Sequence, residues 1–252
     1  FLADGGLARI VKPLYRIALY FVKIVFFQNA ADKNLFVDEG IIESKVCRLS
    51  PGSGVDLDKF ISSDPPLSDQ LTFLLVARML WDKGIGEFIE AARLIKLKYP
   101  NTRFQLLGPL GVENRSCISN KDMEGWQKEG VIEYLGETDD VGRYIKAACC
   151  VVLPSYREGT SRVLLEAAAM SRPLIATDVP GCREVIEDGI TGFLCKSHDH
   201  NDLSYKMERM ILLPYETRRG MGKKGRQKVE QEFNQNIVCE LYIDAIEECC
   251  TK

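Results

Sequence analysis

Short apolar segments alternate with amphipathic segments between residues 72 and 194, and this alternation leaves few folds open to the chain. The apolar runs have the length of buried strands and cover residues 72–77, 103–107, 131–135, 149–153, 174–177 and 192–194. The amphipathic segments have helical spacing and cover residues 85–98, 141–148, 161–170 and 183–187. Strands that alternate with helices form a parallel sheet with helices on both faces. We therefore predict an α/β domain built on a doubly wound parallel sheet.

The flanks of this domain have other patterns. Residues 203–250 are helical throughout, in three segments broken near Pro214 and Asn234. Residues 46–49 are typical of a short strand, and residues 58–70, rich in proline, serine and aspartate, are typical of a linker. We predict that the last helix packs back on the N-terminal segment. The predicted divisions are an N-terminal segment at 1–60, a linker at 61–70 and a C-terminal domain at 71–252.

Composition narrows the classes of partner that the chain can bind and the compartment in which it acts. The formal net charge of −3 over 252 residues argues against a nucleic-acid binder on bulk electrostatics. The nine cysteines lack C-x-x-C spacing, which favours reduced thiols in a cytosolic protein. The chain begins with Phe1, and its opening residues lack the layout of a signal peptide. We therefore expect a fragment of a longer protein.

Residues 11–27 are dense in apolar side chains, but three cations interrupt them, so no uncharged run approaches the ~20 residues of a membrane-spanning helix. On a helical projection the basic residues gather on one side, opposite the apolar ones. We predict a basic amphipathic helix that contacts an anionic membrane surface. The alternative is a helix packed on its own domain with its basic side in solvent. The basic residues are Arg9, Lys12, Arg16 and Lys23.

Several catalytic patterns are absent or incomplete. His198 and His200 lie in a polar stretch without a nucleophile motif, and we interpret them as part of a solvated loop. Asp56 and Asp58 form a D-x-D pattern that can hold a divalent metal, but carboxylates in a turn are more often solvated or capping. We therefore expect neither a metal site nor a bound cofactor.

The residues after the strand at 149–153 have the most informative pattern. A loop carries Glu158 and Gly159, and Thr160 or Ser161 can cap the helix that follows. Helix N-termini at the carboxyl edge of a parallel sheet attract phosphate, because unsatisfied N–H groups and the helix dipole favour an anion. Gly159 would let a phosphate approach the backbone closely. This loop is therefore a predicted phosphate site.

Three further charged residues extend this site. Glu166 is the only charge in the apolar part of its helix, so its carboxylate needs hydrogen-bond donors, which sugar hydroxyls could supply. An ion pair with Arg162, four residues earlier, is the alternative. Arg78 and Lys83 follow the strand at 72–77, where two cations could hold a diphosphate. For them the alternative is simple solvation at the surface.

Together these motifs resemble glycosyltransferase family 4, retaining enzymes with two facing Rossmann-like domains in the GT-B fold. The resemblance covers nearly the whole chain and implies that the C-terminal domain binds the donor. The stretch from Phe26 to Asn29 and the basic helix look most like bacterial enzymes that build O-antigen, capsule or glycoprotein oligosaccharides on a polyprenyl diphosphate. The matching segments are Gly54-Val-Asp56 with Phe60, Ala77-Arg78 through Lys83-Gly84, the pair Glu158 and Glu166, and Gly181 to Glu184 followed by Asp188-Gly189 and Gly192-Phe193.

The resemblance implies a role for each site residue. Arg78 and Lys83 would neutralise the diphosphate leaving group in place of a metal, assisted by the N–H groups around Gly159 to Ser161. Glu166 would hold the ribose hydroxyls, and Glu158 would touch the donor sugar or stabilise positive charge near its anomeric carbon. A leaving-group phosphate oxygen would accept the acceptor's proton. One departure is Cys182, where many relatives carry a small residue such as glycine.

The implied function is a retaining, metal-independent transfer of a hexose or N-acetylhexosamine from a UDP-sugar to a polyprenyl-diphosphate-linked glycan. The resemblance places this reaction in cell-surface polysaccharide synthesis, in the cytoplasm at the inner face of the plasma membrane. We expect the fragment alone to be inactive. Two alternatives remain open: a nucleotide-sugar epimerase or hydrolase on the same fold, and a non-catalytic nucleotide-sugar-binding module.

Overall fold

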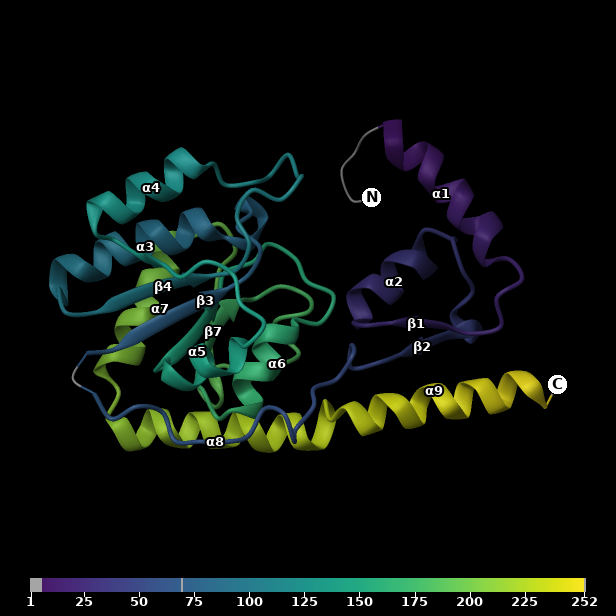
Figure 1. Cartoon of the computed structure of the whole chain (residues 1–252). Helices are drawn as coiled ribbons and strands as arrows, with labels where there is room; N and C mark the ends of the chain where they lie inside the picture. Colours follow the sequence, from purple (N-terminus) through teal and green to yellow (C-terminus); the bar gives the residue numbers. More distant parts are fainter. Residues whose placement is uncertain (1–5, 69, 252) are drawn as a thin grey trace.

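The computed structural model describes residues 6–68 and 70–251, so the first five residues of the predicted N-terminal segment and residue 69 of the predicted linker lie outside it. The chain forms two unequal parts that lie side by side (Figure 1). The smaller part is built from the N-terminal residues around a two-stranded sheet, and the larger part holds a six-stranded sheet.

The six-stranded sheet is parallel and has the order β5-β4-β3-β6-β7-β8. Its inner strands are buried along nearly their whole length, because helices cover both faces. The predicted doubly wound α/β fold is therefore confirmed. The strands are β3 (Thr72–Val76), β4 (Arg103–Leu107), β5 (Glu133–Tyr134), β6 (Cys150–Leu153), β7 (Leu174–Thr177) and β8 (Gly192–Cys195).

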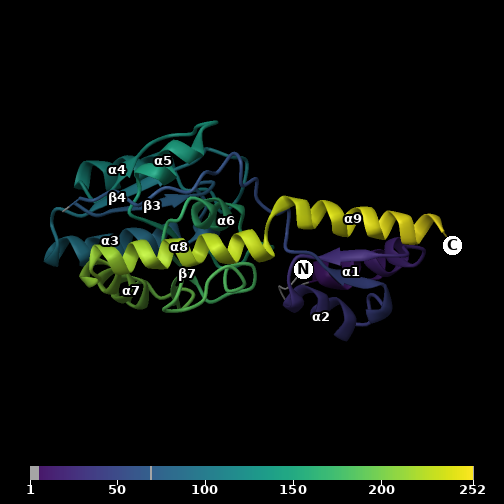
Figure 2. The same ribbon diagram turned by 90° about the horizontal axis from the view of Figure 1, so that it is seen from below.

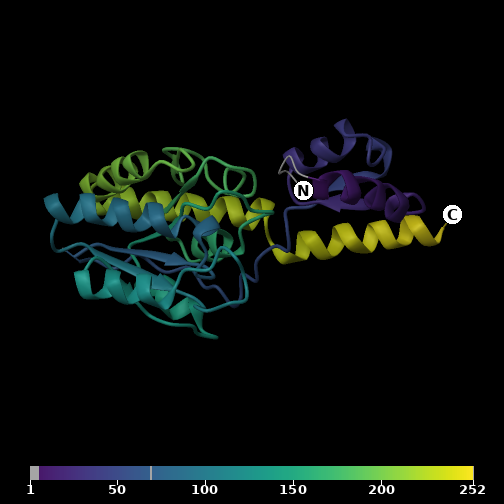
Figure 3. The ribbon, with the colours of Figure 1, turned by 90° about the horizontal axis from the view of Figure 1, so that it is seen from above.

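Alternate residues of β3 enter two separate cores, as the period of two in a strand requires. Phe73 and Leu75 pack with α3 and α7, whereas Leu74 packs with α5 and α6 on the other face. Figure 3 shows the sheet between these two helical layers. The helices of this part are α3 (Ile85–Lys98), α4 (Asn120–Glu129), α5 (Val141–Ala147), α6 (Arg162–Ala169), α7 (His200–Leu212) and α8 (Tyr215–Glu232), and α9 (Gln235–Cys250) follows them.

The larger part differs from the prediction in two places. The expected helix at 183–187 is a series of hydrogen-bonded turns, because Gly181 has a φ of 84° and the Glu184 carboxylate accepts the Gly181 N–H at 2.7 Å. The helix α4 was not predicted, although Ser119 caps its start and Gly130 ends it in the left-handed conformation.

The smaller part contains α1 (Gly6–Leu19), β1 (Val25–Phe27), α2 (Ala30–Asp38) and β2 (Cys47–Leu49), with β1 parallel to β2. The predicted continuous helix at 11–27 is wrong, because the chain leaves the helix after Leu19 and becomes extended at Val25. Lys23 therefore lies outside the helix that was expected to carry it. Across residues 6–68 and 70–251, no helix combines the length and apolarity needed to cross a bilayer.

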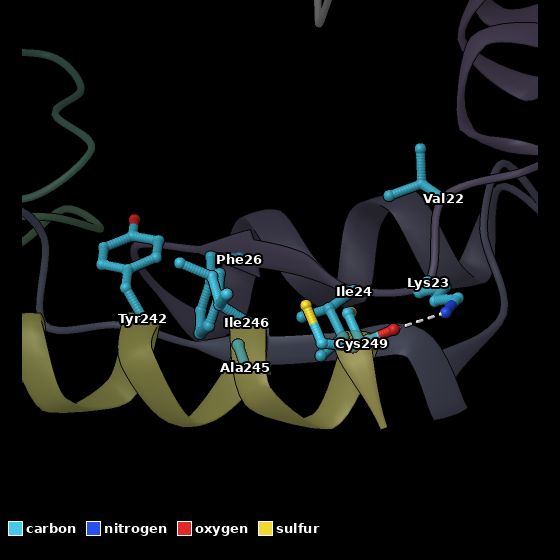
Figure 4. A pocket seen from close by; sticks show the side chains of 9 residues that line it. Val22, Lys23, Ile24, Phe26, Tyr242, Ala245, Ile246 and Cys249 are labelled. Atoms are coloured by element: carbon cyan, nitrogen blue, oxygen red, sulfur yellow. Dashed lines mark hydrogen bonds between the residues drawn. The ribbon is translucent and has the colours of Figure 1, made fainter. Parts of the chain in front are cut away.

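The last helix, α9, continues the direction of α8 and lies along the N-terminal residues (Figure 2). The rings of Phe26 and Tyr242 lie 4.7 Å apart, and Lys23 Nζ donates to the Cys249 carbonyl oxygen at 2.7 Å. Between them is an apolar groove of about 430 Å³, in which Ile246 also lies (Figure 4). The two parts of the molecule are thus joined by the helix at the end of the chain as well as by the residues before β3.

Candidate functional site

The order of the sheet fixes where a ligand can bind. β3 lies between β4 and β6, so the winding of the chain reverses between β3 and β6. Ligands of open α/β sheets bind at this switch point, outside the carboxyl ends of the strands. The loops after β3 (77–84) and β6 (154–161) meet there, and they carry most of the predicted site residues.

Lys83 and Glu158 are brought together from these two loops. Lys83 Nζ lies 2.5 Å from Glu158 Oε1, and the two side chains are 20% and 15% exposed. Lys83 ends a short 3₁₀ helix, and Gly84 follows it with a φ of 72°. A Cβ at Gly84 would lie 2.1 Å from the Pro154 carbonyl oxygen, so only glycine lets the loops approach so closely.

Arg78 lies directly after β3, in the same loop as Lys83, and its side chain is exposed. The structure therefore places two cations and one carboxylate at the switch point. A loop of this composition can bind a polyanion, because a cation can exchange an internal carboxylate partner for phosphate oxygens.

In the loop before α6, some of the N–H groups that were predicted to bind phosphate already have partners within the chain. Ser161 is the N-cap residue, but its side chain makes no cap hydrogen bond, and its N–H donates to the Gly181 carbonyl oxygen at 3.0 Å. The Glu158 N–H likewise donates to the Pro180 carbonyl oxygen at 3.3 Å. A loop contact thus already satisfies the Ser161 N–H, and its use for phosphate stays a prediction.

Thr160 lies in the same loop, and its N–H is directed toward the smaller part of the molecule. It donates to Gln28 Oε1 at 3.0 Å. Asn29 Nδ2 donates to the Gly159 carbonyl oxygen at 3.1 Å, and the Arg157 guanidinium pairs with Asp32. Sequence reasoning missed these contacts, because they join residues more than a hundred positions apart. The sequence Gln28-Asn29, which follows the apolar β1, was the available signal.

Glu166 has both an ion pair with Arg162 and an open cavity beside it, the two alternatives that the sequence left open. Its side chain is 15% exposed, and its carboxylate lies 3.7 Å from the guanidinium of Arg162, which is largely exposed. Burial raises the pKa of Glu166, and the positive charges of Arg162 and Lys59 oppose this shift. Glu166 also borders a cavity of about 370 Å³, lined as well by Phe60 and Gly142. A long ion pair beside an open cavity leaves carboxylate oxygens available to hydroxyl donors.

His200 is the first residue of α7, so it does not lie in a loop as the sequence suggested. His198 is exposed in the turn before it, in agreement with the sequence, and also contacts a neighbouring ring. Its φ is 59°, and its ring lies 3.6 Å, centroid to centroid, from that of Tyr156. The Tyr156 hydroxyl donates to Glu87 at 2.8 Å, and burial, with the nearby Glu87 carboxylate, raises the pKa of Tyr156. His198 thus packs against the loop that leads to Glu158.

The D-x-D motif has a local structural role. Asp56 Oδ1 accepts the N–H groups of Asp58 and Lys59 at 2.9 and 3.0 Å, which is the capping alternative. In the described part of the chain, no three Asp, Glu, His or Cys side chains converge as metal ligands would. Metal-independent transfer stays a prediction.

The chain is similar in sequence to known glycosyltransferases. The family described as glycosyl transferases group 1 matches residues 58–228. The chain is 28% identical over 246 residues to the N,N'-diacetylbacillosaminyl-diphospho-undecaprenol alpha-1,3-N-acetylgalactosaminyltransferase of Campylobacter jejuni, covering 93% of this chain and 62% of that protein. It is 29% identical over 208 residues to the capsular polysaccharide biosynthesis glycosyltransferase CapM of Staphylococcus aureus, covering 79% of this chain and 54% of CapM. The chain thus spans roughly half to three fifths of these relatives.

Solved structures give the same fold. Sucrose-phosphate synthase from Thermosynechococcus elongatus matches 99% of this chain and 64% of its own, with a TM-score of 0.81 and 23% identity. HepE of Anabaena, solved in complex with UDP, matches 98% of this chain and 70% of its own, with a TM-score of 0.83 and 17% identity. The predicted α/β fold with a doubly wound parallel sheet, as in glycosyltransferases of the GT-B fold, is confirmed.

Proposed function

The chain belongs to the glycosyl transferases of group 1, and on this premise we propose that it forms the donor-binding part of a retaining hexosyltransferase. The proposed donor is a UDP-hexose or UDP-N-acetylhexosamine, and the proposed acceptor is a polyprenyl-diphosphate-linked glycan in cell-surface polysaccharide synthesis. The name of the C. jejuni relative supports this acceptor class, and the UDP complex of HepE supports this donor class.

The observation that carries the proposal is the charged cluster at the switch point of the sheet. Lys83 and Arg78 lie where the donor's diphosphate would bind, and Lys83 is held by Glu158 at 2.5 Å. A diphosphate that binds Lys83 would replace this internal partner. The freed Glu158 would then lie beside the sugar and stabilise positive charge at its anomeric carbon.

In the proposed reaction the bond between the anomeric carbon and the phosphate oxygen breaks, and the acceptor oxygen forms the new bond on the same face. The acceptor's proton goes to an oxygen of the leaving diphosphate. The two cations stabilise the charge that develops on this group, so the chain needs neither a nucleophile nor, in this proposal, a metal. Glu166 holds the ribose hydroxyls from the neighbouring cavity.

The proposed place of action is the cytoplasmic face of the inner membrane, because a polyprenyl-linked acceptor is held there by its lipid. Arg9, Arg16 and Lys23 have exposed side chains, whereas Lys12 is paired with Glu39 at 2.5 Å. The proposal therefore relies on three of the four cations that the sequence suggested.

Calorimetry with UDP, GDP and dTDP in the presence of EDTA tests the proposed donor site. We expect UDP to bind and the affinity to survive chelation, because lysine and arginine supply the countercharge. Product analysis of the whole enzyme with a UDP-sugar then distinguishes glycosyl transfer from release of free sugar or formation of an epimer. Loss of UDP binding on chelation, with recovery on addition of manganese, would contradict the metal-free site.

A further inference from the structure

Gln28, directly after β1, lies against the loop at residues 157–160, which the sequence predicts to be a phosphate site. Its Oε1 accepts the Thr160 N–H at 3.0 Å, and its backbone oxygen accepts the Thr160 hydroxyl at 3.1 Å. The residue is exposed, so burial does not hold the side chain in this position. The hydrogen bond from the Thr160 N–H holds the Gln28 side chain there.

The same amide oxygen also covers Gly159. A Cβ at Gly159 would lie 2.2 Å from Gln28 Oε1, so the oxygen occupies the space that the missing side chain leaves free. Both features that favour phosphate in this loop, an N–H donor and close access to the backbone, are thus taken by one uncharged oxygen. A phosphate oxygen would accept the same hydrogen bond and would add charge to it.

We propose that Gln28 is a further donor-site residue, which holds the phosphate position at the Thr160 N–H until the donor's diphosphate displaces it. The inference rests on the proposed function, because it needs a nucleoside diphosphate as the ligand. Gln28 thereby sets the affinity for the phosphate groups and leaves that for the nucleoside unchanged.

The contacts around Gln28 allow this exchange without separating the two parts of the molecule. Asn29 is buried and binds the Gly159 carbonyl oxygen, and Asp32 pairs with Arg157. Neither contact uses the Thr160 N–H. Rotation of one exposed side chain is therefore enough to open the phosphate position, while the loop stays attached.

Dissociation constants of UDP and uridine, measured by NMR titration of the 252-residue chain, test the proposal. Gln28→Ala should strengthen UDP binding about 3- to 10-fold, the range for removal of one competing neutral hydrogen bond. Gln28→Glu should weaken UDP binding more than about 10-fold, because its carboxylate keeps the hydrogen bond and repels the diphosphate. Uridine, which lacks phosphate, should bind all three proteins equally.

Asp32→Asn is the matched control, because it weakens the loop contact through Arg157 and leaves the Thr160 N–H occupied. The ratio of its dissociation constants for UDP and uridine should equal that of the parent. If it strengthens UDP binding as much as Gln28→Ala does, release of the loop is the cause and the proposal is overturned. Unchanged or weaker UDP binding by a folded Gln28→Ala protein also overturns it. A parent chain that does not bind UDP overturns the proposed function as well.

Discussion

At the scale of single residues, Glu166 combines a cost in folding with a proposed role in binding the ribose. Burial raises its pKa, so its ionised form is less stable in the folded chain than in the unfolded one. The carboxylate borders a cavity, and its ion pair with Arg162 is long and involves a largely exposed guanidinium. Such a residue is better explained by a ligand than by stability.

We expect Glu166→Gln to weaken UDP binding by ~1.5–3 kcal/mol, because charged hydrogen bonds to the ribose are lost. Calorimetry measures this change. Arg162→Gln is the control, since it removes the long ion pair and leaves the carboxylate in place, and it should change UDP affinity much less. Equal losses in both variants would indicate that the ion pair, and not a ligand contact, accounts for Glu166.

The same substitution should stabilise the ligand-free chain at neutral pH. The raised pKa means that the penalty for Glu166 appears as the pH rises through the ordinary carboxyl range and is complete above the folded-state pKa. Urea unfolding at several pH values measures this. The advantage of Glu166→Gln should vanish in acid, where the glutamate is protonated in both states.

At the scale of elements, the sequence predicted regular segments well and contacts poorly. The bounds of α3, β4 and β7 coincide with the predicted segments, because their apolar spacing is regular and their ends carry clear signals. Residues 11–27 misled the prediction, since a helix and a following strand share one continuous apolar run. A pattern of this kind does not mark the position where the period changes.

The predicted linker at 61–70 is fixed to the larger part by a buried arginine. Arg172 is fully buried, and burial lowers its pKa to about 10. It donates to both the carbonyl and the hydroxyl oxygen of Ser63, at 2.7 and 2.8 Å. It also donates to the carbonyl oxygens of Ile145, Lys146 and Met170, each at 3.0 Å. One side chain therefore joins the linker to the ends of α5 and α6.

Arg172→Met should lower the free energy of unfolding by about 3 kcal/mol, because several buried oxygens lose their donors at once. Arg103→Met is the control. It removes an arginine that is 42% exposed and paired with Glu133, and such a surface pair contributes ~1 kcal/mol or less. Urea denaturation compares the two. A similar small loss in both would mean that water replaces the Arg172 hydrogen bonds.

At the scale of the whole molecule, the candidate site depends on contacts that no local pattern could supply. Lys83 and Glu158 were each predicted from their position after a strand, and the sheet order brings them together. Gln28 and Thr160 meet only because α9 and residues 50–55 hold the two parts side by side. The chain crosses between the two parts twice, once before β3 and once before α9. Val55 and Asn234, one from each crossing, form a parallel β-bridge. Sequence spacing contains no information on such a crossing.

The exposed surface of α1 and of the residues between α1 and β1 gives the last prediction its physical basis. Arg16 donates to the carbonyl oxygens of Glu39 and Gly40, and Lys23 to that of Cys249. Carbonyl groups orient these cations without neutralising them, so their charge still reaches the solvent. The apolar residues Ile10 and Ile17 are also exposed, at 62% and 72%.

We expect the chain to sediment with vesicles that contain anionic lipid, and less so as salt rises, because the surface potential is screened within about a Debye length. Arg9, Arg16 and Lys23 together would supply roughly 3 kcal/mol, at ~1 kcal/mol for each cation near the surface. Replacing these three by Gln should abolish sedimentation at low salt and leave UDP affinity intact. Lys12 is left unchanged, because Glu39 already neutralises it.

A matched triple variant controls for total charge, with Gln at the exposed cations Lys121, Lys128 and Lys224 of the larger part. It should sediment as the parent does, because these cations lie on α4 and α8 of the larger part, whereas α1 belongs to the smaller part (Figure 1). If both triple variants lose binding equally, net charge alone attracts the protein. If the variant at Arg9, Arg16 and Lys23 still sediments at high salt, the exposed apolar residues Ile10 and Ile17 make the contact. The attraction predicted from the basic residues is then not the cause.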